Sequence, residues 1–190
     1  MRSALVSSPA RLGLFVAVLS SLGAAVRGAE RDVSINEIHG WGGDWIELYN
    51  TGSGAIDVSG WRLGDCDAQG RTRLTRALTF PRGSTLPARG YLLVVSDRGK
   101  KKKGKEESDV ERICSSRSGT RCFRASWKVS QKSGEVVRLI APDGRLLNEV
   151  TYPAGIVAKT RSWSRQPNGS GAFVVAEPTP GRDNSPAPAQ

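Results

Sequence analysis

The sequence of 190 residues has room for one domain with flanking segments. Hydrophobic residues make up 38% and charged residues 24% of it, a composition that excludes a chain disordered throughout. The formal net charge of +10 attracts anionic polymers in a salt-dependent way, which is a property of the whole surface and does not define a binding site.

The first 29 residues are predicted to be a secretory signal peptide. Arg2 and Arg11 form a positive n-region, and the uncharged run at 12–26 that follows is shorter than the about 20 apolar residues of a membrane-spanning helix. Small residues come next, and they allow cleavage after Ala25 or after Ala29. An uncleaved anchor is the alternative. We therefore expect a mature chain without a membrane span that is secreted, periplasmic or located in the cell envelope.

The chain has three cysteines, and export makes a disulfide plausible. Cys114 and Cys122 are close in sequence and belong to one polar stretch, so they are the preferred pair. Cys66 is then left over, either buried or free, and its redox state stays open. A zinc site is disfavoured because the sequence has no CxxC and its one histidine, His39, is distant from every cysteine. No metal and no cofactor are predicted.

From Val33 onward the chain reads as short β-strands separated by turns. Apolar and polar residues alternate with the period of a half-buried strand at 33–38 and 44–50, and the uninterrupted apolar run at 91–95 suits a central strand. A third element covers 56–65. A weaker strand, rich in threonine and interrupted by arginines, covers 72–80.

The second half contains the strongest hairpin signal in the sequence. Two apolar stretches, 134–140 and 146–152, flank an Asp143-Gly144 turn. Two further strands, at 162–165 and 173–175, end the series. No segment has a sustained helical period.

Two segments interrupt this pattern. Residues 97–126 form a polar, basic insertion, and a loop of that length inside a domain is either functional or disordered. From Glu177 the chain is rich in proline and alanine and is expected to be disordered. The predicted division is a signal peptide at 1–29, a β domain at 30–176 and a C-terminal tail at 177–190.

Eight or nine short strands at this spacing indicate an all-β sandwich or barrel. Without helices to cover a sheet, the strands must pack sheet on sheet, so we predict a β-sandwich. Large aromatic side chains dominate the packing of small domains. The predicted structural core therefore includes the tryptophans Trp45, Trp61, Trp127 and Trp163.

Several segments, taken in order, resemble the lamin tail domain in the form found on exported bacterial proteins. They are 35–38, 44–50, 57–61, 86–91, 133–137, 142–144, 150–153 and 178–181. The resemblance implies an immunoglobulin-like β-sandwich and a binding or architectural module to which no catalytic residues are assigned. Lamin tails bind proteins and DNA, so the resemblance leaves as partner an unknown protein or an anionic polymer, DNA among them. The 97–126 insertion departs from the short connection of the family and inherits no role from it.

The sharpest candidate for a binding site is the basic run in the insertion. Its lysines are suited to contact phosphates or acidic polysaccharide as point charges: Lys100, Lys101, Lys102, Lys103 and Lys105. The acidic residues that follow them partly neutralise the run, and a solvated loop is the alternative.

Catalytic chemistry finds little support in the sequence. There is no GxSxG, HExxH or P-loop motif. His39 with Asp44 and Glu47 could suggest a metal-dependent hydrolase, but alternation puts the two acids on opposite faces of a strand, and Glu47 is expected to face solvent or pair with an arginine. Asp65 and Asp67 fall short of the ligands that Ca²⁺ needs. The chain is therefore predicted not to be an enzyme.

Overall fold

The computed structural model describes residue 28 and residues 30–41, 43–67, 69–96, 109–115, 120–155 and 157–184. The regular structure in these ranges is mainly β-strand, and the helical elements with described bounds are a short 3-10 helix, η1 (Glu30–Asp32), and one α-helix, α2 (Asp109–Ser115). The predicted all-β sandwich is confirmed. No helix in these ranges has both the length and the apolar character needed to cross a bilayer.

The larger sheet has six strands, and it contains both the earliest and the latest strands of the domain. Its order is β12-β11-β1-β2-β7-β8, antiparallel throughout except for the parallel pair β7–β8. The strands are β1 (Val33–His39), β2 (Trp45–Asn50), β7 (Tyr91–Ser96), β8 (Arg121–Ala125), β11 (Ser162–Gln166) and β12 (Ala172–Ala176).

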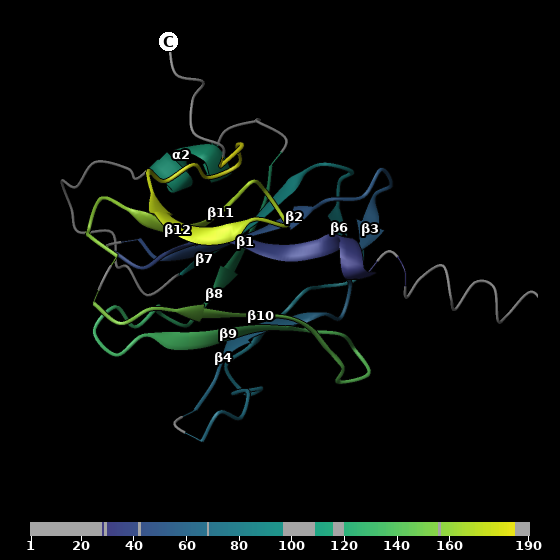
Figure 1. Ribbon diagram of the computed structural model, residues 1–190. Coiled ribbons are helices and arrows are strands. Elements are labelled where there is room, and N and C mark those ends of the chain that lie inside the picture. The colour runs from purple at the N-terminus through teal and green to yellow at the C-terminus, as the bar shows by residue number, and fades with distance from the viewer. Residues whose placement is uncertain are drawn as a thin grey trace, which may run out of the picture.

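The smaller sheet has four strands in the order β10-β9-β4-β5, and a third sheet consists of the pair β3–β6. Figure 1 shows the larger sheet above the smaller one, with α2 and the C-terminal segment on the far side of the larger sheet. The smaller sheets are built from β3 (Ile56–Asp57), β4 (Arg62–Asp65), β5 (Leu78–Thr79), β6 (Thr85–Leu86), β9 (Glu135–Ile140) and β10 (Leu146–Tyr152). The predicted hairpin at Asp143-Gly144 is therefore β9–β10, and Gly144 adopts a φ of +91° in its turn.

The core between the sheets consists of inward-facing side chains, which are alternate residues along each strand. Trp61 and Trp127 lie in it, each at most 5% exposed. Trp163 is only partly buried and packs against the margin of this core. Trp45 is buried too, but it lies on the opposite face of the larger sheet, in a second cluster with Leu93 and Val95. The prediction that Trp45 faces the core together with Trp61 is therefore wrong.

The outer face of the larger sheet is covered as well, which distinguishes it from a sheet with one solvated side. Part of the cover is α2, whose Ile113 and Cys114 pack on the cluster around Trp45. The rest is the segment 177–184, which binds the same face through hydrogen bonds described below. The prediction that the chain is disordered from Glu177 is wrong for residues 177–184.

The 97–126 insertion is not a simple loop. Its last residues form β8, the edge strand that pairs in parallel with β7, and its centre contains α2. The sequence shows no alternation strong enough to predict β8, because Arg121 and Arg124 interrupt it. Residues 97–108 and 116–119 of the insertion lie outside the part of the chain that the structure describes. The same holds for the predicted signal peptide, apart from Gly28.

Candidate functional site

Two carboxylates lie side by side inside the outer face of the larger sheet. Glu37 of β1 and Glu47 of β2 are direct cross-strand partners, and both are 0% exposed. A β-bulge between Ile35 and Glu37 turns both Asn36 and Glu37 toward this face, because two residues of β1 there oppose one of β2. Buried like charges at such a separation are costly unless they are hydrogen-bonded or share a proton.

Each carboxylate has its own set of hydrogen-bond donors. Glu47 accepts bonds from the Asn36 side-chain amide to Oε1 (2.9 Å) and from the Gly181 backbone N–H to Oε2 (2.7 Å). Glu37 accepts the Thr179 N–H at Oε1 (3.0 Å) and is bonded to the Ser162 hydroxyl. Half of these donors come from the C-terminal segment, so 177–184 is the lid of the acid pair.

The hydrogen bonds distinguish the two acids. Thr179 Oγ1 lies 2.9 Å from Glu37 Oε2 and 2.6 Å from Asn184 Oδ1, yet one hydroxyl carries one proton. The Asn184 amide nitrogen donates to the Asn36 carbonyl, which leaves Asn184 Oδ1 as an acceptor. Both contacts are satisfied if Glu37 is protonated on Oε2 and donates to the threonine, which donates onward. Both oxygens of Glu47, by contrast, face N–H donors and suit a carboxylate.

The electrostatics agree with a shared proton. Burial raises the pKa of Glu37, opposed by its bonds to Ser162 and Thr179. Burial, and then the neighbouring Glu37, raise the pKa of Glu47 well above its usual range, which by itself favours a proton on Glu47. We assign the proton to Glu37 instead, because the Thr179 hydroxyl beside it can accept one, whereas both oxygens of Glu47 receive N–H groups. The expectation that Glu47 faces solvent or pairs with an arginine is wrong, since alternation gives the face of a residue but not what covers that face.

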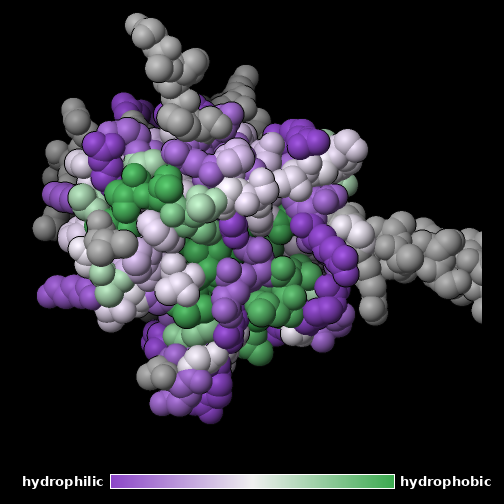
Figure 2. Space-filling view, in the orientation of Figure 1, coloured by the Kyte–Doolittle hydropathy of each residue, from purple (hydrophilic) through white to green (hydrophobic). Residues whose placement is uncertain are grey.

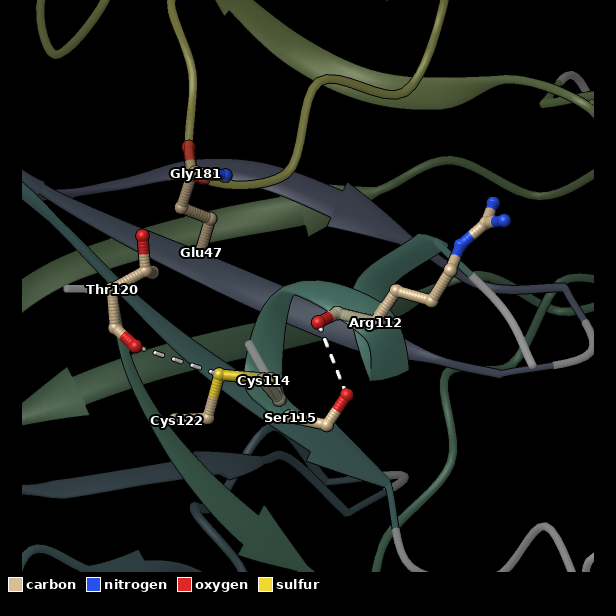
Figure 3. The surroundings of a disulfide bond; sticks show 7 residues. All are labelled: Glu47, Arg112, Cys114, Ser115, Thr120, Cys122 and Gly181. Atoms are coloured by element: carbon tan, nitrogen blue, oxygen red, sulfur yellow. Dashed lines mark hydrogen bonds between the residues drawn. A yellow bond between two sulfur atoms is a disulfide. The ribbon is translucent and has the colours of Figure 1, made fainter. Parts of the chain in front are cut away.

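The disulfide Cys114–Cys122 joins α2 to β8 (Figure 3). It thereby holds α2, which covers the outer face together with the segment 177–184. The predicted pairing is confirmed, and Cys66 is a free, buried thiol. Gly181 lies where the two parts of the cover meet. An added Cβ on Gly181 would come within 3.1 Å of Thr120 Oγ1, and its φ of +73° favours glycine. Figure 3 shows Gly181 directly beside Glu47.

The other residues singled out from the sequence do not assemble into a reactive site. His39 packs edge-on against Trp45, and burial lowers its pKa to about 4, which keeps the ring neutral near pH 7. Asp65 and Asp67 pair with Arg73 and Arg71. Among the described residues, no group of three or more His, Cys, Asp or Glu side chains could hold a metal ion.

The lysines of the basic run, Lys100, Lys101, Lys102, Lys103 and Lys105, lie outside the described residues. Asp44 is buried, and its Oδ2 accepts the Val129 N–H at 2.9 Å. This bond fastens the start of β2 to the segment that precedes β9. Asp44 and Glu47 therefore serve separate hydrogen-bond networks.

A partly exposed apolar surface lies at one end of the larger sheet. The smaller sheet ends at β10, which lies under β1, so β11 and β12 extend beyond it. Their inward-facing side chains form what we call the β11–β12 shelf: Trp163, Arg165, Phe173 and Val175. Figure 2 shows apolar side chains over this end of the molecule and between the two layers.

The shelf is rigid. The Trp163 and Phe173 rings stack with centroids 5.7 Å apart, and Arg165 Cζ lies 4.5 Å from the Phe173 ring centroid. Trp163 Nε1 donates to the Thr151 carbonyl of β10 (3.1 Å), and Arg165 Nε donates to the Ile35 carbonyl (3.0 Å). The sequence prediction missed this surface because it depends on the unequal widths of the two sheets.

The family model described as Lamin Tail Domain matches residues 27–154, about two thirds of the sequence. The chain belongs to the lamin tail domain family. The predicted resemblance to that family is confirmed, and the sandwich of this lamin tail domain is immunoglobulin-like. No curated protein matches the sequence. The family match ends before β11 and β12, so the shelf and the lid of the acid pair lie beyond it.

Proposed function

We propose that this lamin tail domain is an exported, non-catalytic binding or scaffold module that acts through the β11–β12 shelf, in the bacterial envelope or extracellular space. The observation that carries the proposal is the shelf itself. The shelf combines stacked aromatic rings with an arginine, all partly exposed, and aromatic and arginine side chains are those that contribute most to protein interfaces. Val175, at 42% exposure, is the most accessible apolar residue there.

The internal use of the buried acids supports a binding role over a catalytic one. A catalytic acid or base must reach a substrate proton. Glu37 and Glu47 are both fully buried, and the lid segment occupies their oxygens. The acid pair therefore stabilises the fold. What the described residues present to a partner is their surface.

The test is capture from the envelope fraction of the source cells by the immobilised mature protein. Val175→Asp places a charge on the shelf, and Leu74→Asp places the same charge on a residue that is 49% exposed elsewhere. We expect Val175→Asp to abolish capture and Leu74→Asp to leave it unchanged. Equal capture by both variants and the wild type, or no capture by any, would overturn the proposal.

A second candidate function is binding of DNA or acidic polysaccharide by the basic run. The specific observation in its favour is the presence of five lysines within the six residues 100–105. Affinity for DNA should then fall steeply with salt concentration, because phosphate contacts release counterions. Replacing the five lysines with glutamine should make the affinity for DNA less dependent on salt concentration. The same replacement of the exposed Lys128, Lys132 and Lys159 should have a smaller effect. Salt-independent binding would exclude this function.

The remaining alternative is a metal-dependent hydrolase. Nuclease and esterase assays of the mature protein with and without divalent ions address it directly. We expect no turnover in either condition. Turnover abolished by a chelator would refute the non-catalytic assignment.

A further inference from the structure

We propose that the partner of the β11–β12 shelf is a second copy of this chain, joined edge to edge through β12 so that the two six-stranded sheets become continuous. The inference rests on the proposed function and deepens it by naming the occupant of the shelf. Its first basis is that β12 is an edge strand, which pairs only with β11 among the described strands.

Hydrogen bonds elsewhere in the sheet determine which groups of β12 point outward. The Ser96 N–H donates to the Asp44 carbonyl, and the Asn50 N–H donates to the Gly90 carbonyl, so alternate residues of β2 bond to β7. The remaining residues of β2, Glu47 among them, bond to β1. In antiparallel sheets each residue directs both backbone groups to one side, and this alternation carries on from strand to strand.

Carried through β1 and β11, the alternation directs the backbone of Val174 toward Ser164. The N–H and C=O groups of Phe173 and Val175 therefore point away from the sheet. An edge strand with outward backbone groups is a template for another strand. Only a polypeptide offers the matching row of donors and acceptors.

The side chains of β12 favour its own copy as that strand. The sequence Ala172-Phe173-Val174-Val175-Ala176 has small residues at both ends and large apolar residues between them, so it is self-complementary about Val174. In an antiparallel pair centred on Val174, Phe173 of each protomer lies opposite Val175 of the other. The four outward groups of each protomer are thereby satisfied, and the two shelves merge into one apolar cluster.

The distribution of charge also favours contact through β12. The full chain has a net charge of +10, so two copies repel each other over most of their surfaces. β12 contains no charged residue, and both Val174 and Val175 are exposed, on opposite faces of the strand. Natural edge strands are commonly protected by lysine or proline, and β12 has neither.

The decisive experiment is sedimentation of the purified mature protein over a concentration series. The weight-average mass should rise from one protomer toward two. Val175→Pro removes an outward N–H and should hold the mass at one protomer, since proline is tolerated on an edge strand where no bond within the sheet is lost. Val175→Thr keeps the N–H and the branched side chain and should dimerise like the wild type.

A covalent test does not depend on the proline variant being folded. Residues paired on a two-fold axis face each other, so Val174→Cys should form a disulfide-linked dimer under mild oxidation. Leu74→Cys, at a position more exposed than Val174 and located between β4 and β5 of the smaller sheet, should remain monomeric. Crosslinking of Val174→Cys no faster than that of Leu74→Cys overturns the inference, as does a wild-type mass of one protomer at every concentration.

The two proposals can fail separately. A monomeric wild type whose envelope capture is lost in Val175→Asp would mean that a strand of another protein occupies the shelf, which overturns the dimer and leaves the binding function standing. A dimer that crosslinks through Val174→Cys but captures nothing would leave the dimer standing and overturn the capture of other partners.

Discussion

The two faces of the six-stranded sheet are both covered over its central strands, but by different means. The inner face is apolar and packs against the smaller sheet, with residues such as Ile38, Ile46 and Leu92. The outer face contains two carboxylates and a serine pair, and it is covered by α2, which a disulfide joins to β8, and by the segment 177–184. Burial of the first face follows from the hydrophobic effect alone, whereas burial of the second requires specific hydrogen bonds.

The largest effect should come from the inner face. Trp61→Ala removes a side chain that is 3% exposed and leaves a cavity between the sheets, so we expect a loss of ~3–5 kcal/mol in the free energy of unfolding. Urea unfolding followed by circular dichroism measures it. Trp41→Ala is the control, since Trp41 is 38% exposed and should cost far less. Equal losses would mean that Trp61 does not anchor the core.

Removing the disulfide tests the part of the outer-face cover that α2 forms. Its cysteines are 8 residues apart, and closing a loop of that size stabilises the folded state by roughly 2–3 kcal/mol on the chain-entropy model. The variant Cys114→Ala/Cys122→Ala should lose about that much in urea unfolding. It should also expose Trp45 more than Trp61, which selective fluorescence quenching would reveal in single-tryptophan backgrounds. Cys66→Ala is the control for the loss of a buried thiol.

Replacing one acid of the pair tests the assignment of its charge. In Glu47→Gln, an amide NH₂ must face either the Asn36 amide or the Gly181 N–H, so one buried donor loses its acceptor. We expect a loss of ~1–3 kcal/mol at neutral pH, measured by thermal and urea unfolding. A variant as stable as the wild type would place the proton on Glu47 instead.

The smallest effect at a single pH should be that of Glu37→Gln, which reproduces the protonated acid. Its amide can donate to Thr179 Oγ1 while its oxygen accepts the Thr179 N–H, so we expect a change within about 0.5 kcal/mol at low pH.

The pH dependence of this variant is more informative. Because burial raises the pKa of Glu37 in the folded protein, the folded state keeps a proton that the unfolded chain releases. The stability that this proton contributes is fully present below the pKa of Glu37 in the unfolded chain. It is lost as the pH rises through the pKa of Glu37 in the folded protein. Glu37→Gln should lack this loss and gain on the wild type as pH increases. Burial raises the pKa of Glu135 to about 7, so Glu135 makes its own contribution to the decline of stability with pH. Glu135→Gln should remove that contribution. Parallel pH curves for the wild type and Glu37→Gln would contradict the shared proton.

The inner face could be predicted from the sequence because alternation, turn residues and the Asp143-Gly144 hairpin are local signals. The pairing of Cys114 with Cys122 was also local, since the two lie close in sequence. The cover of the outer face was not predictable in the same way. Glu47 alternates like a solvent-facing residue, and only contacts with Gly181, 134 positions later, reveal its burial. The shelf depends on one sheet being wider than the other, which no strand encodes by itself.

The position of the lid in the chain has a consequence for how the protein can be made. The acids belong to the first two strands of the larger sheet, whereas Thr179 and Gly181 are among its last described residues. A polypeptide that emerges from its N-terminus cannot cover this acid pair until the segment with Thr179 and Gly181 has also emerged, so the pair is completed later than the two strands that carry it. A variant truncated at the end of the family match would lack β11, β12 and the lid, so β1 with Glu37 would become an edge strand.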